Sequence, residues 1–365
     1  MRELASESSG SAMACPAAGN DREDRPARAE IGLGLQSDKP AGTYARLARR
    51  AEECGFDVLT VFGDLMYQPP IFPLLEMAAA TERVRLGPAC LNPYSMAPYE
   101  IAGQVAALDL ASAGRAYLGL ARGTWLGAVG IAQPRPVVAL RECAEVVYRL
   151  LRGDTGGFTG EVFTLAAGTA LRYRVHRPDP PLLVGAWGER GAALAGRIAA
   201  EIKVGGSANP AMVPVIRERL RAGAARAGRP VEDVGIVLGA VTVVDRDGEA
   251  ARAHARTEVA MYLAVVADLD PTAGVPADLV ARVTALVDAG EHAAAGRLIP
   301  DDVLDMFAFA GTPEQVAARA QALIDAGVRR VEFGTPHGLT DGGGVDLLGT
   351  AVLPLLRREP VEVLS

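Results

Sequence analysis

The sequence predicts an α/β protein with the (β/α)8 architecture of a TIM barrel, enlarged by insertions. Short apolar runs alternate with segments of helical periodicity, which favours a parallel sheet covered by helices. The apolar runs suit strands that are buried on both faces. Eight strand–helix units can be counted along the 365 residues, which favours a closed barrel over an open doubly wound sheet.

Residues 84–125 form the clearest βαβ unit of the chain. Apolar runs at 84–86 and 116–120 flank a segment at 101–110 whose apolar residues recur at helical spacing. Small residues and two prolines fill 87–93, where the first strand would simply end. Such a loop lets main chain approach a flat ligand closely, so it predicts a site at the carboxyl end of a parallel strand.

The remaining elements follow the same rhythm, and turn residues mark their ends. We expect strands at 31–35, 57–62, 84–86, 116–120, 182–185, 202–204, 234–244 and 330–333. We expect helices at 44–54, 74–81, 101–110, 134–151, from 188 onward, and at 211–227, 316–326 and 345–356. Gly55 ends the first helix, and Thr312 with Gln315 forms a capping box that includes Pro313 at the first helical position.

Two stretches interrupt the alternation and define the expected domain organisation. Residues 153–181 contain glycine, proline and short alternating runs, which predicts a hairpin-like insertion. Residues 249–309 are helical, alanine-rich and too long for one crossover, which predicts a second insertion. We therefore expect a disordered tail at 1–29, one barrel domain at 30–358 with both insertions, and a short tail at 359–365.

Composition excludes several classes of function. The net charge of −7 gives no basic footprint for nucleic acid and no polybasic patch for membrane lipid. No segment has ~18 uninterrupted apolar residues, so we expect no membrane span. The four cysteines and four histidines are scattered without ligand spacing, so we expect reduced thiols, no metal and a cytoplasmic location. A small-molecule substrate is the default expectation.

Candidate site residues follow the carboxyl ends of the expected strands, where barrels of this kind carry their active sites. The strand ends hold Gln36, Gly63-Asp64, Ala89-Cys90-Asn92, Gly123-Thr124, Ala186-Trp187-Gly188, Gly205-Gly206-Ser207 and Thr335-His337. The set is poor in general bases and rich in glycine and amide groups. Main-chain donors and small side chains hold a planar cofactor better than they perform hydrolysis, so redox chemistry by a bound cofactor is predicted.

Each of these candidates also has a structural interpretation. Asp64 either contacts the cofactor or substrate, or caps a helix. The glycines around Trp187 either offer main-chain N–H groups to a phosphate or form a plain turn. Cys90 is a nucleophile or a packing residue, and His337 is a proton donor or a structural residue. Trp125 either walls the pocket or belongs to the core.

The sequence resembles the luciferase-like monooxygenase superfamily, and within it the deazaflavin-dependent methylenetetrahydromethanopterin reductases and their bacterial relatives. The likeness runs from about Ile31 to Leu356 through GFDVLTVFGD, RVRLGPACLNPY, GRAYLGLARG, PLLVGAWGERGAALAGRIA, FAGTPEQVAARAQALIDAGV and FGTPHG. It implies a bacterial-luciferase-like barrel that binds coenzyme F420 or FMN and forms a homodimer.

The resemblance also assigns roles to particular residues. It places a bulge that backs the deazaflavin ring, often with a non-prolyl cis peptide, at Ala89-Cys90. It makes Asp64 a cofactor contact and puts Asn92 beside the bulge. The phosphate region falls on 186–191, so the predicted cofactor-binding set is Asp64, Ala89, Cys90, Asn92, Gly185, Ala186, Trp187, Gly188 and Gly191. The predicted catalytic set is Asp64, Thr124 and His337.

The chain departs from the family pattern at three positions. Gln36 stands where the reductases carry a glutamate implicated in proton transfer, and glutamine supplies no titrating proton. Leu65 follows Asp64 where the family has histidine, and Thr124 replaces the acidic residue of related sugar-phosphate dehydrogenases. These departures leave the fold and cofactor in place but argue against carrying over the reductase's substrate.

The sequence therefore predicts an F420-dependent oxidoreductase that transfers a hydride to or from a small organic substrate. The first alternative is an FMN-dependent monooxygenase of the same fold. Basic residues leading from the phosphate site favour F420, and Arg190 and Lys203 are the candidates for that role. The second alternative is a barrel that has lost catalysis and only binds ligand.

Overall fold

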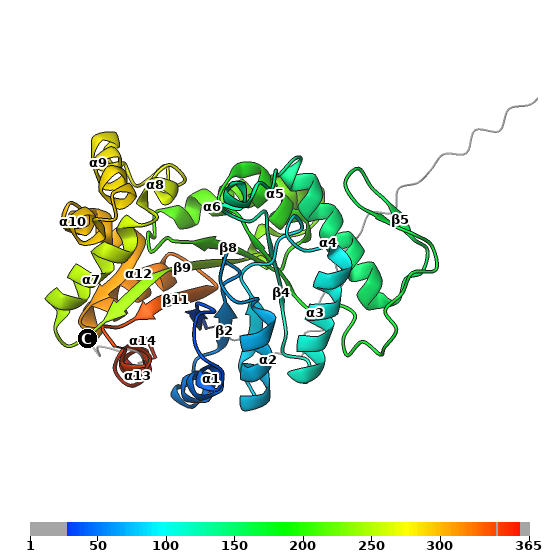
Figure 1. Ribbon diagram of the computed structural model, residues 1–365, viewed down its shortest axis with the longest axis horizontal. Coiled ribbons are helices and arrows are strands. Elements are labelled where there is room, and N and C mark those ends of the chain that lie inside the picture. The colour runs from blue at the N-terminus through cyan, green and yellow to red at the C-terminus, as the bar shows by residue number, and fades with distance from the viewer. Residues whose placement is uncertain (1–27, 341, 358–365) are drawn as a thin grey trace, which may run out of the picture.

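The computed structural model describes residues 28–340 and 342–357. A parallel sheet at the centre is wrapped by helices, and its strands follow the order β3-β2-β1-β11-β9-β8-β7-β4 (Figure 1). Parallel bridges from Leu86 to Ala116 and from Leu91 to Leu120 join β3 to the β4 segment and close the ring. The predicted (β/α)8 barrel is confirmed. The predicted tails lie almost wholly outside the described residues.

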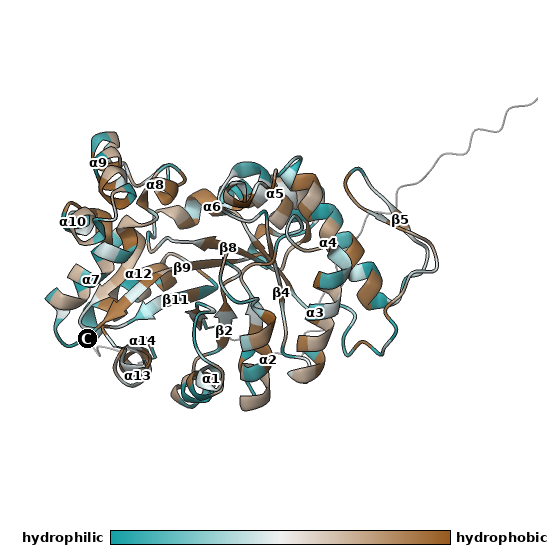
Figure 2. Ribbon diagram, in the orientation of Figure 1, coloured by the Kyte–Doolittle hydropathy of each residue, from teal (hydrophilic) through white to brown (hydrophobic). Residues whose placement is uncertain are grey.

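The strands match the expected positions closely because each contains a run of buried apolar residues. Within the described residues they are β1 (Glu30–Leu35), β2 (Val58–Val61), β3 (Arg85–Pro88), β4 (Leu118–Ala121), β7 (Leu182–Gly185), β8 (Glu201–Gly205), β9 (Gly235–Val244) and β11 (Arg330–His337). Figure 2 shows β8 and β9 as hydrophobic ribbons, with hydrophilic residues on the surrounding helices. Parallel strands that are buried on both faces are expected to be mostly hydrophobic.

The helices of the barrel follow the strands and end at the predicted turn residues. They are α1 (Thr43–Cys54), α2 (Ile71–Ala80), α3 (Pro98–Ala111), α4 (Pro136–Arg152), α5 (Glu189–Ile198), α6 (Met212–Arg226), α12 (Pro313–Asp325), α13 (Gly343–Leu347) and α14 (Leu353–Leu356). Gly55 ends α1 with φ 88°, and both hydrogen bonds of the capping box between Thr312 and Gln315 are present. Short 3-10 helices lie at Leu126–Val129 and Val231–Asp233.

The last predicted helix, 345–356, is interrupted. A π-helical stretch at Leu348–Val352 separates α13 from α14, and Pro354 lies in the first turn of α14. Proline has no N–H to donate, so the regular α-helical hydrogen-bond ladder cannot run through this position. The single helix expected from the apolar periodicity is therefore wrong in this detail.

The first insertion contains the predicted hairpin. Strands β5 (Phe158–Thr159) and β6 (Thr164–Leu165) pair antiparallel. Glu142 on α4 accepts hydrogen bonds from the backbone N–H groups of residues 161–163, which ties the hairpin to the barrel. In Figure 1 the hairpin lies at the end of the long axis opposite the second insertion.

The second insertion has its own core and one strand that the sequence analysis missed. Its helices are α7 (Gly248–Ala260), α8 (Leu263–Val266), α9 (Ala277–Asp288), α10 (His292–Arg297) and α11 (Asp301–Phe307). Strand β10 (Ala308–Gly311) then pairs parallel with the end of β9, so the helical assignment to Phe309 was wrong. Four residues between α11 and the capping box give too short a run for periodicity to separate strand from helix.

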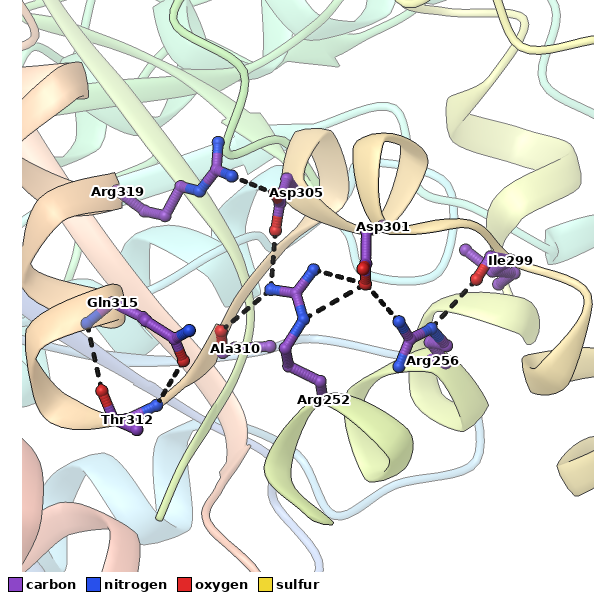
Figure 3. Close-up of polar contacts among 9 residues, drawn as sticks. All are labelled: Arg252, Arg256, Ile299, Asp301, Asp305, Ala310, Thr312, Gln315 and Arg319. Carbon is purple, nitrogen blue, oxygen red and sulfur yellow. Dashed lines mark hydrogen bonds and ion pairs between the residues drawn. The ribbon is translucent and has the colours of Figure 1, made fainter. Parts of the chain in front are cut away.

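Charged side chains join this insertion to the barrel. Arg252 on α7 donates to Asp305 at 2.8 Å and to Asp301 at 2.7 Å, both on α11 (Figure 3). Arg256 also pairs with Asp301, and Arg319 on α12 pairs with Asp305. Since α12 belongs to the barrel, the cluster fixes α7 and α11 against it.

Two features of residues 28–340 and 342–357 bear on function. None of their helices combines the length and apolar composition needed to cross a membrane. No three His, Cys, Asp or Glu side chains among them are grouped so as to hold a metal ion.

Candidate active site

A cleft opens at the carboxyl ends of β2, β3 and β4. It is lined by Gly63, Asp64, Leu65, Met66, Tyr67, Gln68, Pro69, Pro70, Cys90, Leu91, Asn92, Ser95, Gly123, Thr124 and Leu126. Four of the predicted site residues, Asp64, Cys90, Asn92 and Thr124, are thus brought together. They come from the loops that follow three different strands, as sites on this architecture do.

Asp64 is the only carboxylate among the residues that line the cleft. Strands β1 and β2 pair in register, with Leu35 opposite Val61, so the residues that follow them lie side by side. Gln36 donates from Nε2 to Asp64 Oδ2 at 2.9 Å. The carboxylate is therefore held at the cleft by an amide rather than serving as a helix cap.

The bulge after β3 is built from main chain. The Ala89–Cys90 peptide bond is cis, at the position to which the resemblance assigned one. Ala89 N donates to the Val61 carbonyl at 2.8 Å, and Leu91 N donates to the Gly119 carbonyl at 2.9 Å. The bulge is thus hydrogen-bonded to both neighbouring strands and presents a fixed surface to the cleft.

The Cys90 thiol is a packing group rather than a nucleophile. Burial raises the pKa of Cys90 to about 12, although the Lys203 charge opposes this. Nucleophilic cysteines act as thiolates, and a thiol with so high a pKa stays protonated near neutral pH. Cys90 packs against the interior cluster of Val58, Tyr117, Leu183 and Val237, so its thiol is a neutral packing group of the barrel.

Asn92 shapes the loop that carries it. Its Oδ1 accepts hydrogen bonds from the N–H groups of Tyr94 and Ser95, at 3.1 and 2.9 Å, which forms a tight turn. Gly123 faces this amide with φ 83°, and a Cβ there would lie 3.0 Å from Asn92 Cγ. Thr124 follows Gly123 and is exposed at the cleft.

The predicted phosphate segment lies at the start of α5 and outside the cleft lining. Gly188 is the N-cap of α5, so the first main-chain N–H groups of the helix have no side-chain cap. Trp187 donates from its indole to the Gly205 carbonyl at 3.2 Å, and Arg219 donates to the Trp187 carbonyl at 2.7 Å. Gly191 packs against Ala186, where a Cβ would approach to 2.7 Å.

His337 is not at the cleft. The residue is 3% exposed, and its Nε2 is 3.0 Å from the Gly34 carbonyl and 3.3 Å from the Phe333 carbonyl. Both oxygens are acceptors, so Nε2 carries the proton. Burial lowers the pKa of His337 to about 4, which keeps the ring neutral. The structure thus corrects the prediction of a proton donor and supports the structural interpretation.

Lys203 also has a different role from the predicted one. It is 6% exposed and forms an ion pair with Glu332 inside the barrel, so it cannot lead away from a phosphate site. Thr60 donates to the same carboxylate at 2.8 Å, and Arg330 lies 3.8 Å from it. Lys203 and Arg330 lower the pKa of Glu332 against the opposing effect of burial.

Sequence analysis missed this interior network. The ladder continues from Arg330 to Glu201 at 3.4 Å and from Glu201 to Arg85 at 3.2 Å. The sequence did contain a signal for this network. Side chains two residues apart in a strand point to the same face, so the charged residues at 201 and 203 share one face of β8, and those at 330 and 332 share one face of β11. Charged residues at such positions in buried strands indicate a polar barrel interior.

The cleft suits a flat cofactor. Main chain of the bulge approaches it directly, and a Cβ at Gly63 would overlap the carbonyl oxygen of Cys90. The side chains of Leu91 and Leu126 supply an apolar face, and the carboxylate of Asp64 supplies a hydrogen-bond acceptor. Gln36 Oε1 is buried without a hydrogen-bond partner among the described residues, which marks an unusual polar position beside the cleft.

Comparison with known proteins agrees with this geometry. The family model for luciferase-like monooxygenases matches residues 26–330. A 5,10-methylenetetrahydromethanopterin reductase of Archaeoglobus fulgidus is 30% identical over 324 residues, which cover 86% of this chain and 95% of that protein. An F420-dependent glucose-6-phosphate dehydrogenase of Nakamurella multipartita is 31% identical over 236 residues, covering 60% of this chain and 68% of that protein.

A solved structure shares the architecture. The coenzyme F420 dependent tetrahydromethanopterin reductase of Methanopyrus kandleri superposes with a TM-score of 0.83 at 25% identity, and the match covers 91% of this chain and all of that one. The family model spans well over half of the residues, and the barrel, the bulge and the cleft are all present. The chain belongs to the luciferase-like monooxygenase family.

Proposed function

We propose that this protein is an F420-dependent oxidoreductase that transfers a hydride between the deazaflavin and a small organic substrate. The observation that carries the proposal is the cleft beside the Ala89-Cys90 bulge, which is lined by Asp64 and by the residues of the bulge. Relatives that are named as F420-dependent enzymes match this chain over most of its length or over more than half of it.

In this proposal the chain binds and orients, while bound F420 supplies the hydride chemistry. The bulge backs the ring, and Asp64 accepts a hydrogen bond from the bound ligand. Asn92 holds the loop that forms the adjoining wall through its bonds to Tyr94 and Ser95. Apolar neighbours such as Leu91 and Leu126 exclude water from the cleft.

The phosphate of the cofactor is assigned to the start of α5. Main-chain N–H groups at a helix N-terminus favour an anion, and 185–188 leads directly into that turn. Gly188 leaves open space there, since a Cβ at this position would meet no atom within 4 Å, and Arg190 is exposed nearby. We do not assign Lys203 to the phosphate, because Lys203 forms an ion pair with Glu332 inside the barrel.

Thr124 is proposed to face the substrate. It is exposed at the cleft, and its hydroxyl donates or accepts a hydrogen bond without titrating. Gln36 takes the place of the reductases' glutamate, so we do not extend the methylenetetrahydromethanopterin substrate to this chain. We further propose one barrel domain over 30–358 that works as a homodimer in the cytoplasm.

A parallel titration of the purified protein with F420 and FMN tests the proposal. Each cofactor is added in oxidised and in reduced form, and binding is followed by fluorescence. The expected result is tight binding of F420 with FMN at least tenfold weaker. Preference for FMN would support monooxygenase chemistry instead, and failure of both cofactors to bind would support a non-catalytic barrel.

A further inference from the structure

The contact between Gln36 and Asp64 carries an inference about how the cleft is kept ready for its ligand. An ionised carboxylate only accepts hydrogen bonds, so the NH2 group of Gln36 must face Asp64. The amide carbonyl then points elsewhere, and its Oε1 is buried without a partner among the described residues. A buried acceptor left unpaired is unfavourable. The orientation of Gln36 therefore serves Asp64 rather than the stability of the glutamine itself.

The main chain around Gln36 is fixed by other groups. Tyr44 Oη donates to the Gln36 carbonyl at 3.0 Å, and it accepts from Lys39 N at 2.9 Å. Ser37 is fully buried and donates from Oγ to the Gln68 carbonyl at 2.7 Å. A change in the side chain of Gln36 alone thus leaves these backbone contacts in place.

No lysine or arginine is among the residues that line the cleft, so no cation there pairs with Asp64. On the β1–α1 loop, Lys39 pairs with Asp38 at 2.7 Å. On β8 and β11, beneath the bulge, Lys203 pairs with Glu332. The bulge itself contributes the protonated Cys90 thiol, and the loop of Asp64 contributes the half-exposed Tyr67. The residue at position 36 is therefore the direct neighbour that decides how Asp64 is held.

We propose that Gln36 is a positioning residue that holds Asp64 as a hydrogen-bond acceptor for the ligand in the cleft, and that its neutral amide keeps this function independent of pH. The proposal rests on the proposed function, in which that ligand is F420. A glutamate at position 36 would place two carboxylates about 3 Å apart, where one of them must hold a shared proton. Ligand binding would then depend on the protonation of the pair.

The experiment measures the Kd of oxidised F420 by fluorescence titration between pH 6 and 8.5. It compares the natural protein with Gln36→Glu, Gln36→Met and Asp64→Asn. The ratio of each variant's Kd to that of the natural protein at the same pH removes the titration of F420 itself. Gln321→Glu is the matched control, because Gln321 on α12 donates to Asp325 at 2.8 Å in the same way but lies on the surface.

We expect Gln36→Met to raise the Kd about tenfold at every pH, since about 1.4 kcal/mol, the loss of one hydrogen bond, corresponds to a factor of ten. Gln36→Glu is expected to give a Kd ratio that is larger at pH 8.5 than at pH 6. Asp64→Asn should weaken binding without that pH trend, and the Gln321→Glu ratio should stay near one.

Thermal unfolding separates positioning from a structural role. Loss of the unpaired carbonyl should leave the Tm of Gln36→Met equal to or above that of the natural protein, although binding is weaker. A Gln36→Met variant that binds F420 normally, or a Gln36→Glu ratio that does not change with pH, would overturn the inference. An unaltered Kd for Asp64→Asn would do the same. If the natural protein does not bind F420, the proposed function itself fails.

Discussion

The buried imidazole of His337 predicts that the stability of this protein falls as the pH is lowered from about 6.5 towards 4. The ring lies against the Gly34 and Phe333 carbonyls, and burial lowers the pKa of His337 from 6.5 to about 4. His337 has φ 80°, a left-handed conformation in which asparagine is tolerated. His337→Asn therefore removes the titrating group without straining the backbone, although its shorter amide does not reach the Gly34 carbonyl as Nε2 does.

The sign and size of the effect follow from the two pKa values. Below pH 6.5 the unfolded chain takes up a proton at this histidine, while the folded chain does not until about pH 4. The free energy of unfolding therefore falls as the pH is lowered from 6.5 towards 4, and it is level above 6.5. At 1.36 kcal/mol per pKa unit, the full loss is about 3 kcal/mol.

Urea unfolding at a series of pH values, followed by tryptophan fluorescence, measures this loss. Other groups, such as Glu332 and Glu201, also have lowered pKa values and destabilise the protein in acid, so the natural protein and His337→Asn are compared at each pH. The difference between them should change by about 3 kcal/mol between pH 7 and pH 4. Parallel stability curves for the two proteins would refute the assignment of a buried neutral histidine.

Three further variants test other parts of the structure. Lys203→Met removes the nearest cation from the buried Glu332 and leaves it only the more distant Arg330, at 3.8 Å. This should cost about 3 kcal/mol in urea unfolding, and adding Glu332→Gln should recover most of it. Equal losses in the single and double variants would contradict the ion pair. Arg252→Ala removes the bonds to Asp301 at the base of the second insertion, so hydrogen exchange should accelerate selectively in α7 and α11. Gly63→Ala pushes a methyl group into the bulge and should weaken F420 binding more than tenfold with an unchanged circular dichroism spectrum.

The fold was predictable because its signals are local. Each strand is a short buried run, and the turns that end helices use residues with a direct physical role, such as Gly55 and the Thr312 capping box. Strand β10 was missed because its four residues follow α11 without a turn. The π-helical stretch before Pro354 was missed because apolar periodicity does not report hydrogen bonding.

The site was predictable only where position in the barrel fixes it. Asp64, Cys90 and Thr124 follow neighbouring strands, and the topology alone brings them to one cleft. The environment of His337 could not be derived, because its burial depends on contacts with Gly34, which lies 303 residues away. Lys203 was misassigned for the same reason, since its partner Glu332 lies on another strand.

The glycines of the strands explain how a bulge fits at the mouth of this barrel. A Cβ at Gly119 on β4 would overlap the Pro88 carbonyl, and one at Gly63 after β2 would overlap the Cys90 carbonyl. A Cβ at Gly185 on β7 would lie 3.0 Å from Cys90 Sγ. Three strands thus each omit a side chain where the chain at 88–90 passes. Since none of these three glycines has a positive φ, close approach rather than backbone conformation requires them, and the strand-end glycines are part of the site that they surround.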